Sequence, residues 1–517
     1  MRKVLLGLLA LVLVSAGSLF AVAADEPLII GTTDRVTELS FANCYDHYTW
    51  HVLRNVTDAL TKFDPETGEF VGAIAESWDV SADGLVWTFY IRPGITFWDG
   101  EVCDADAVKY SLDRTLRLDG PEGGVGLIKV IDQIEVVDAL TVRIYLTQAD
   151  AVFDQRMSDQ IAPALIYSPA SVPDDDFANG EFAGTGPYTL VEHLPDQHVI
   201  YEAYPGYYGE APKSANVIEQ MYADAATLRA AIEAGDVDVV FRTLAPQDVA
   251  DLEANPNVII QAFPPSPGVR YMLFNVTQSP VDVVQVRQAI CYAVDRAAIV
   301  SQVFSGTVEP IYTMVPAVDP PFFGALPTFP ERDLEEVKRL LAQVGYDEAN
   351  PLELNLWYTP KHYGTFEADV AAVLKGSIEE TGVINITIQV LEWGAYTERM
   401  GAGGFDMFLL GWHPDYFEPS NFLAPWTTES PESLGTYFNH HPNFGAYKNI
   451  MDIATTTVDK GVRAKLYEAI QILSTQDVPW IPLWSMTDEM IAAWLPGVQG
   501  VFVDITMDIT VANIWKE

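Results

Sequence analysis

The sequence predicts an α/β protein with more than one lobe. Strand-like and helix-like segments alternate through the C-terminal half, from "VRYMLFNV" at 269–276 to "FDMFLLGW" at 405–412. The chain has 517 residues, too many for one simple core, so two or three structural units are expected. Hydrophobic residues make up 49% of the chain and charged residues 20%, which is typical of a globular protein.

The first 24 residues have the pattern of a secretory signal. Arg2 and Lys3 precede an apolar run, and the small residues of "AVAADEP" predict cleavage after Ala23 or Ala24. The apolar run is short for a membrane anchor. No cysteine follows it that could carry a lipid. We therefore expect export to the periplasm or the cell exterior.

The net charge and the cysteines exclude several classes of protein. The formal net charge of −43 repels nucleic acid and anionic lipid, and it suits cationic or neutral ligands. Three cysteines are too few for a disulfide scaffold. Cys291 lies in a helical pattern and is expected to be a buried small hydrophobe. Whether Cys44 pairs with Cys103 stays open.

The N-terminal half contains a strand, a helix and then a block of hairpins. Apolar spacing predicts the helix over "DHYTWHVLRNVTDAL", and Ser-Ala-Asp-Gly marks a hairpin turn before "LVWTFYI". Asp104 is expected to cap the next helix. The predicted strands, helices and hairpins occupy 26–36, 46–60, 76–100, 105–118, 131–146, 183–193 and 224–241.

The C-terminal half begins after "FPPSPG", whose three prolines suit a crossing between lobes. Strands are expected at 269–276, 351–359, 384–393 and 405–412, and helical segments at 282–304, 333–346 and 366–382. This alternation predicts a mostly parallel sheet with ligand loops at the carboxyl ends of its strands.

No catalytic signature is present. The chain lacks a G-x-S-x-G elbow, an H-E-x-x-H pair and a phosphate-binding G-x-x-x-x-G-K loop. His47 and His51 have helical i, i+4 spacing, but aromatic neighbours disfavour a metal site there. We expect no enzyme, no metal and no cofactor. A secreted glycoside hydrolase is a remote alternative, motivated only by the many carboxylates and tryptophans.

Four segments together resemble a known family. They are "AESWDVSADGLVWTFYIRPGITFWDG" with "DADAVKYSLDR", "GTGPYTLVE", "VRQAICYAVDRAAIV" and "FDMFLLGWHPDYFEPSNFL". In this order they resemble the peptide/nickel class of extracellular solute-binding proteins, which serve dipeptide and oligopeptide ABC importers. The resemblance implies a two-lobed clamshell of the periplasmic-binding-protein type with an inserted domain, hence three structural domains. It places lobe I at 25–62, 183–265 and 487–517, the inserted domain at 63–182 and lobe II at 266–486.

The same resemblance points to a ligand site. In peptide-binding members, the aspartate of Gly-Trp-x-x-Asp-Tyr holds the α-amino group of the ligand, and that position is Asp415. The chemistry agrees, because an ammonium removed from water needs a countercharge at hydrogen-bond distance. The alternative is that Asp415 caps the turn or helix before "EPSNFL".

Further contacts are expected around Asp415. Gly411 allows close backbone approach, Trp412 and Trp393 offer apolar walls, and Trp412 suits the core equally well. Cys44 and Tyr45 are expected to face the cleft from the other lobe. His413 lies in the same loop, and "HP" at 413–414 departs from a standard oligopeptide binder.

The function implied is that of a binding protein. It is expected to be a monomer that captures a short peptide and delivers it to the membrane permease of an ABC transporter. An oligosaccharide or a nickel complex as ligand stays an alternative within the same fold.

Overall fold

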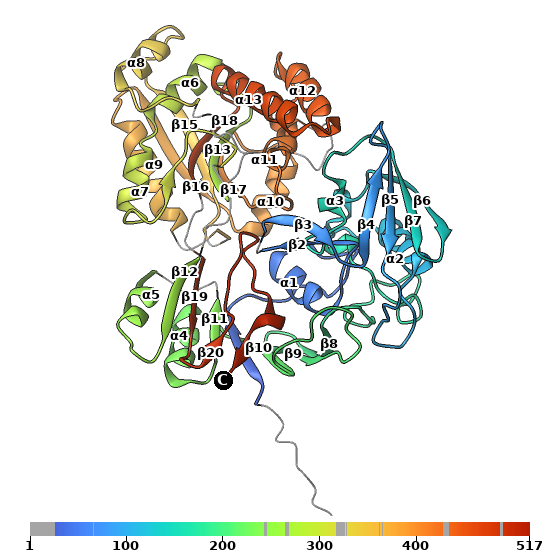
Figure 1. Cartoon of the computed structure of the whole chain (residues 1–517). Coiled ribbons are helices and arrows are strands. Elements are labelled where there is room, and N and C mark those ends of the chain that lie inside the picture. The colour runs from blue at the N-terminus through green and yellow to red at the C-terminus, as the bar shows by residue number, and fades with distance from the viewer. Residues whose placement is uncertain are drawn as a thin grey trace, which may run out of the picture.

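The computed structural model describes residues 26–65, 67–241, 244, 246–263, 268–316, 326, 328–360, 362–363, 366–427, 434–485 and 490–517. The predicted signal, and residues 264–267 of the predicted crossing, lie outside this part. Figure 1 shows three units. The second lobe, in yellow to orange, lies at the top, the third unit, in blue to teal, at the right, and the first lobe below. We define each unit by its sheet.

The first lobe is built on a seven-stranded sheet that gathers distant parts of the chain. Its order is β12-β19-β11-β1-β10-β9-β8, with β1 parallel to β10 and β11 and the other pairs antiparallel. The strands are β1 (Leu28–Thr32), β8 (Tyr188–Leu194), β9 (His198–Ala203), β10 (Asn216–Met221), β11 (Val239–Phe241), β12 (Ile259–Phe263) and β19 (Met490–Trp494). Its helices are α1 (His47–Val56), α4 (Ala225–Ala234) and α5 (Pro246–Glu253).

The third unit contains the two hairpins that the sequence predicts. Its antiparallel sheet has the order β4-β5-β7-β6, from β4 (Ala75–Val80), β5 (Val86–Ile91), β6 (Ile131–Asp138) and β7 (Thr141–Leu146). The cap prediction is confirmed, since the Asp104 carboxylate accepts the N–H groups of Asp106 and Ala107 at 3.1 Å at the start of α2 (Ala105–Leu118). The short helix α3 (Phe153–Arg156) and the hairpin of β2 (Thr61–Asp64) and β3 (Glu69–Gly72) face the second lobe (Figure 1).

The second lobe is built on a six-stranded sheet of order β14-β18-β13-β17-β15-β16. The strands are β13 (Val269–Phe274), β14 (Glu309–Pro310), β15 (Leu352–Tyr358), β16 (Ile384–Val390), β17 (Met407–Trp412) and β18 (Trp480–Ser485). The helices are α6 (Val284–Ala293), α7 (Arg296–Gln302), α8 (Leu334–Ala342), α9 (Glu367–Glu379), α10 (Trp393–Gly401), α11 (Pro419–Leu423), α12 (Phe444–Thr456) and α13 (Lys460–Asp477).

The prediction of a mostly parallel sheet is wrong for this lobe. Only β15, β16 and β17 run parallel, whereas β13 is antiparallel to both β17 and β18. The reason is the chain path: β13 begins the lobe and β18 ends it, and Val269 is paired with Ser485. When the strand that enters a lobe lies beside the strand that leaves it at the same edge, the two strands must run in opposite directions. Because Val269 is also paired with Trp412, the loop after β17 emerges at this same edge, toward the first lobe.

Two predicted elements differ in detail. The helical segment 282–304 is divided, because Val294 is extended and Asp295 begins a new helix by accepting the N–H of Ala298 at 2.8 Å. The strand predicted to reach Trp393 ends at Val390, and Trp393 begins α10. Local apolar patterns do not show where a helix breaks or a strand ends.

The hydrophobic packing divides the described residues into unequal parts. One large core joins the first lobe to the third unit, and a separate core fills the second lobe. The two lobes can therefore move apart without opening a core, which suits a clamshell. We propose the three units as the domains with the limits expected from the sequence; those limits stay a prediction.

The cysteines and helices settle two further points. Cys44, Cys103 and Cys291 are buried free thiols, so the structure contains no Cys44–Cys103 disulfide, and the burial expected for Cys291 is confirmed. Burial also raises the pKa of all three thiols, which keeps them protonated.

Among the described residues, no helix combines the length and apolar character needed to cross a bilayer.

Candidate functional site

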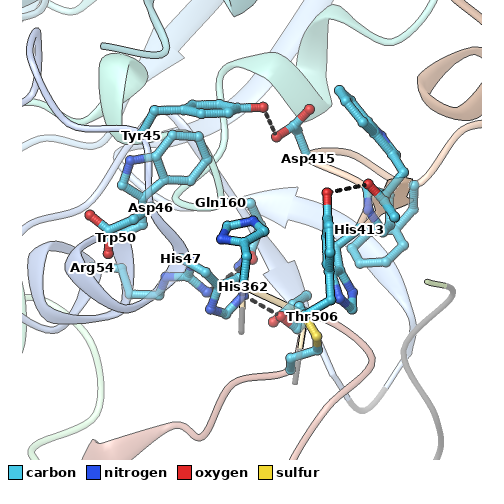
Figure 2. A pocket seen from close by; sticks show the side chains of 16 residues that line it. Tyr45, Asp46, His47, Trp50, Arg54, Gln160, His362, His413, Asp415 and Thr506 are labelled. Atoms are coloured by element: carbon cyan, nitrogen blue, oxygen red, sulfur yellow. Dashed lines mark hydrogen bonds between the residues drawn. The ribbon is translucent and has the colours of Figure 1, made fainter. Parts of the chain in front are cut away.

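A cavity of about 300 Å³ lies where the two lobes meet (Figure 2). Residues 45–46 and helix α1 supply one wall. The segment after β15, the end of β17 and the loop after β17 supply the opposite wall, and residues 506–507 and Gln160 complete the lining. The lining residues are Tyr45, Asp46, His47, Trp50, Arg54, Gln160, His362, Tyr363, Gly411, Trp412, His413, Pro414, Asp415, Phe417, Thr506 and Met507. Five of the seven residues proposed from the sequence are among them.

Asp415 is held by groups from both lobes. Its Oδ1 accepts a hydrogen bond from the Tyr45 hydroxyl at 2.7 Å, which spans the cavity from the first lobe (Figure 2). Its Oδ2 accepts from Asn421 Nδ2 at 3.3 Å, and its N–H donates to Asn421 Oδ1 at 3.1 Å. Both side-chain donors are neutral. No described cation forms a salt bridge with this carboxylate.

The surroundings of Asp415 raise its pKa above the ordinary value. Burial is the largest cause, and the hydrogen bonds from Tyr45 and Asn421, together with the charge of Arg156, only partly oppose it. Desolvation of the Tyr45 hydroxyl and the charge of Asp415 likewise raise the pKa of Tyr45, so this hydroxyl stays a donor. The alternative that Asp415 caps the following helix is wrong, because Glu418 occupies the N-cap of α11. Glu418 is itself paired with Arg463 at 3.1 Å.

Gly411 is required by packing behind the cavity wall. A Cβ atom there would lie 2.7 Å from Arg270 Nη1 and 3.0 Å from Tyr363 Cε1. Arg270 is buried, forms a short ion pair with Glu367 and stacks 3.9 Å from the centroid of the Tyr363 ring. Gly411 was expected to allow the close approach of a ligand. The structure shows that the Arg270 guanidinium also approaches it closely, which sequence reasoning did not anticipate.

The remaining proposed residues differ in how closely they approach the cavity. Trp412 and His413 line it, and Trp412 donates to Asn421 at 2.7 Å. Trp393 lies behind the lining, stacked on His362 with ring centroids 3.5 Å apart. Desolvation and then Arg270 lower the pKa of His362 to about 4. Cys44 is buried in the core and does not line the cavity, so only its neighbour Tyr45 keeps the proposed position.

The first-lobe wall rests on a buried charge network that sequence reasoning missed. His51 lies between Asp508, in a short contact, and Glu219 at 2.9 Å, and Arg54 pairs with Asp508 at 2.5 Å. Burial opposes the imidazolium, but the two carboxylates outweigh it and raise the pKa of His51 to about 10. The nitrogen atoms of His51 are thus engaged by carboxylates. The available signal in the sequence was that His51 and Arg54 lie on one face of the predicted helix. No pattern indicated that residues 219 and 508 would pair with them.

Comparison with known proteins matches the sequence to a family. Residues 69–433 match the model of the bacterial extracellular solute-binding proteins, family 5 (middle region). Di/tripeptide-binding protein 4 of Pseudomonas aeruginosa is 31% identical over 460 residues, covering 83% of each chain. Heme-binding protein A of Haemophilus influenzae is 29% identical over 458 residues, covering 83% of this chain and 81% of its own.

A solved structure extends the match to the fold. NikA from Brucella suis, in complex with Fe(III)-EDTA, superposes with a TM-score of 0.83 at 22% identity, covering 95% of this chain and all of that one. Peptides, heme and a metal chelate thus occur among the ligands of similar proteins, so the fold alone does not select the ligand. The matched family is one of non-enzymatic binding proteins, which bind small solutes delivered to ABC transporters. The chain belongs to family 5 of the bacterial extracellular solute-binding proteins.

Proposed function

We propose that this protein captures a short peptide with a free amino terminus between its two lobes and delivers it to the membrane permease of an ABC importer. The observation that carries the proposal is Asp415, a carboxylate at the cavity with two neutral hydrogen-bond donors. A ligand ammonium would supply the ionic partner, and closure around the pair would strengthen it by excluding water.

The size and polarity of the cavity support a small ligand. Its volume of about 300 Å³ is at the lower end of the range for small-molecule sites, which is about 300–1,000 Å³. Arg54 is the guanidinium in the lining, and Asp508 already neutralises it. Asp46 adds a second carboxylate. The charge balance therefore favours a ligand with a positive group.

Calorimetry with a short peptide library tests the proposal. We expect free-amine dipeptides and tripeptides to bind, and their N-acetylated forms to bind about 100-fold more weakly, since a buried charge pair lost on one side costs about 2–5 kcal/mol. Equal affinity for free and blocked peptides would refute the role of Asp415.

An oligosaccharide remains the second candidate because aromatic rings line the cavity. Trp50, Trp412 and Tyr45 offer apolar faces on which a sugar ring can stack. A shift of tryptophan fluorescence with oligosaccharides, without one for peptides, would favour this ligand instead.

A further inference from the structure

The third unit contacts both partners of the Tyr45–Asp415 hydrogen bond, although it supplies neither of them. This bond joins the two lobes across the cavity at 2.7 Å. One segment of the third unit packs behind Tyr45, and another packs behind the loop that carries Asp415. Arg156, at the end of α3, connects these two segments.

The first segment follows α2 and packs closely on the loop before α1. The N–H of Gly120 donates to the carbonyl of Ala42 at 2.9 Å. A Cβ atom on Gly123 would lie 2.1 Å from the same carbonyl, and one on Gly124 would lie 2.8 Å from Tyr45 Cδ2. The backbone of this segment therefore packs directly against the Tyr45 ring, and a side chain at position 123 would clash with the Ala42 carbonyl.

The second segment, α3, holds the loop after β17. Gln155 Oε1 accepts the N–H of Phe417 at 3.0 Å. Arg156 lies 4.6 Å from the centroid of the Tyr416 ring and donates to the Tyr416 hydroxyl at 3.3 Å. Tyr416 is buried and directly follows Asp415 in the chain.

Arg156 is fixed by the first segment as well. It donates to the carbonyl of Leu127, in the short helix η1 (Val125–Leu127) that continues from Gly124, at 3.1 Å. Asp150 holds it by an ion pair at 2.5 Å. One guanidinium thus contacts the segment behind Tyr45 and the residue beside Asp415.

We propose that Arg156 is a positioning residue that aligns Tyr45 with Asp415 and so couples the third unit to closure of the lobes. Gln155 assists by fixing the backbone of the same loop. This proposal rests on the proposed closure of the lobes around a ligand. It does not depend on which ligand binds.

The test measures lobe separation by pulsed electron spin resonance between labels at D236C and E348C, two exposed positions on different lobes. The native cysteines are buried and should not react. We expect Arg156→Met and Gln155→Met to raise the open-to-closed ratio at least threefold, and Arg156→Lys to restore part of it. Arg117→Met, at an exposed ion pair in the same unit, is the control and should leave the ratio unchanged.

A double-mutant cycle with Tyr45→Phe separates positioning from general damage. If Arg156 acts through the Tyr45 hydroxyl, Arg156→Met should change the ratio less than twofold once that hydroxyl is absent. Full additivity, or an unchanged ratio in both Arg156→Met and Gln155→Met, would overturn the proposal. The affinity for alanyl-phenylalanine should fall about tenfold in Arg156→Met. If the unaltered protein does not bind this peptide, the proposed ligand is wrong. The spin-label result then still decides the role of Arg156.

Discussion

The two walls of the cavity use their charges in different ways. In the first-lobe wall, the charges of His51 and Arg54 have ionic partners: His51 with Glu219 and Asp508, and Arg54 with Asp508. In the second-lobe wall, the hydrogen bonds that the Asp415 carboxylate accepts from other side chains in the described part of the chain come from neutral groups. A charge neutralised by its own chain stabilises the fold, whereas one with neutral partners is available to a ligand. The comparison suggests how to distinguish structural from functional charges in this family.

The largest expected effect comes from Asp508→Asn. This change leaves the buried His51 and the part-buried Arg54 without their shared countercharge. Breaking a buried ion pair by removing one partner costs about 3–5 kcal/mol of unfolding free energy. Urea unfolding followed by circular dichroism measures it. A loss below about 1 kcal/mol would show that the first-lobe network is not structural.

The corresponding aspartate-to-asparagine change in the second-lobe wall should weaken ligand binding rather than the fold. Asp415→Asn keeps the shape of the side chain, and the burial that raises the pKa of Asp415 shows that the charge is costly there. We expect the unfolding free energy to change by less than about 1 kcal/mol, while affinity for a free-amine dipeptide falls about 100-fold. A large loss of stability with unchanged affinity would reverse the comparison.

A smaller effect is expected from Gly411→Ala. The added Cβ would lie 2.7 Å from Arg270 Nη1 and 2.8 Å from its Cδ, so the buried pair must shift. Overpacking of this kind costs about 1–3 kcal/mol. Gly376→Ala, in helix α9 with no atom within 4 Å of the new Cβ, is the matched control and should stabilise slightly. Equal melting temperatures for the two variants would contradict the packing role.

The smallest effect is a dependence of affinity on pH. Burial raises the pKa of Asp415 above its ordinary value of 3.8, and an ammonium ligand binds the charged form. Affinity should therefore fall as the pH falls through that pKa, beginning at a higher pH than for an ordinary aspartate. Calorimetry across acidic pH measures this, and Asp415→Asn should lack the dependence.

Much of the fold follows from local sequence patterns. Alternation and turn residues predicted the hairpins β4–β5 and β6–β7, and helical spacing of apolar residues over 46–60 predicted α1. Strand direction in the second lobe could not be predicted in this way, because it depends on where the chain enters and leaves the lobe. That relation joins Val269 to Ser485, more than two hundred residues apart.

The sequence predicted the part of the site that a single segment of the chain supplies. The loop after β17 was recognised as a ligand loop, and Gly411, Trp412, His413 and Asp415 all line the cavity. Of the residues contributed by distant segments, Tyr45 was expected from the family resemblance, but others, such as Asp508 and Gln160, were not found because no local pattern marks them. Cys44 and Tyr45 are neighbours in the sequence, yet one is buried and the other is 50% exposed.

The most direct test of the central claim is a crystal structure of the complex with alanyl-phenylalanine. The ammonium of the peptide should lie within hydrogen-bond distance of the Asp415 carboxylate, with Arg54 still paired to Asp508. A peptide bound with its amino group elsewhere, and Asp415 still contacted only by Tyr45 and Asn421, would contradict the account.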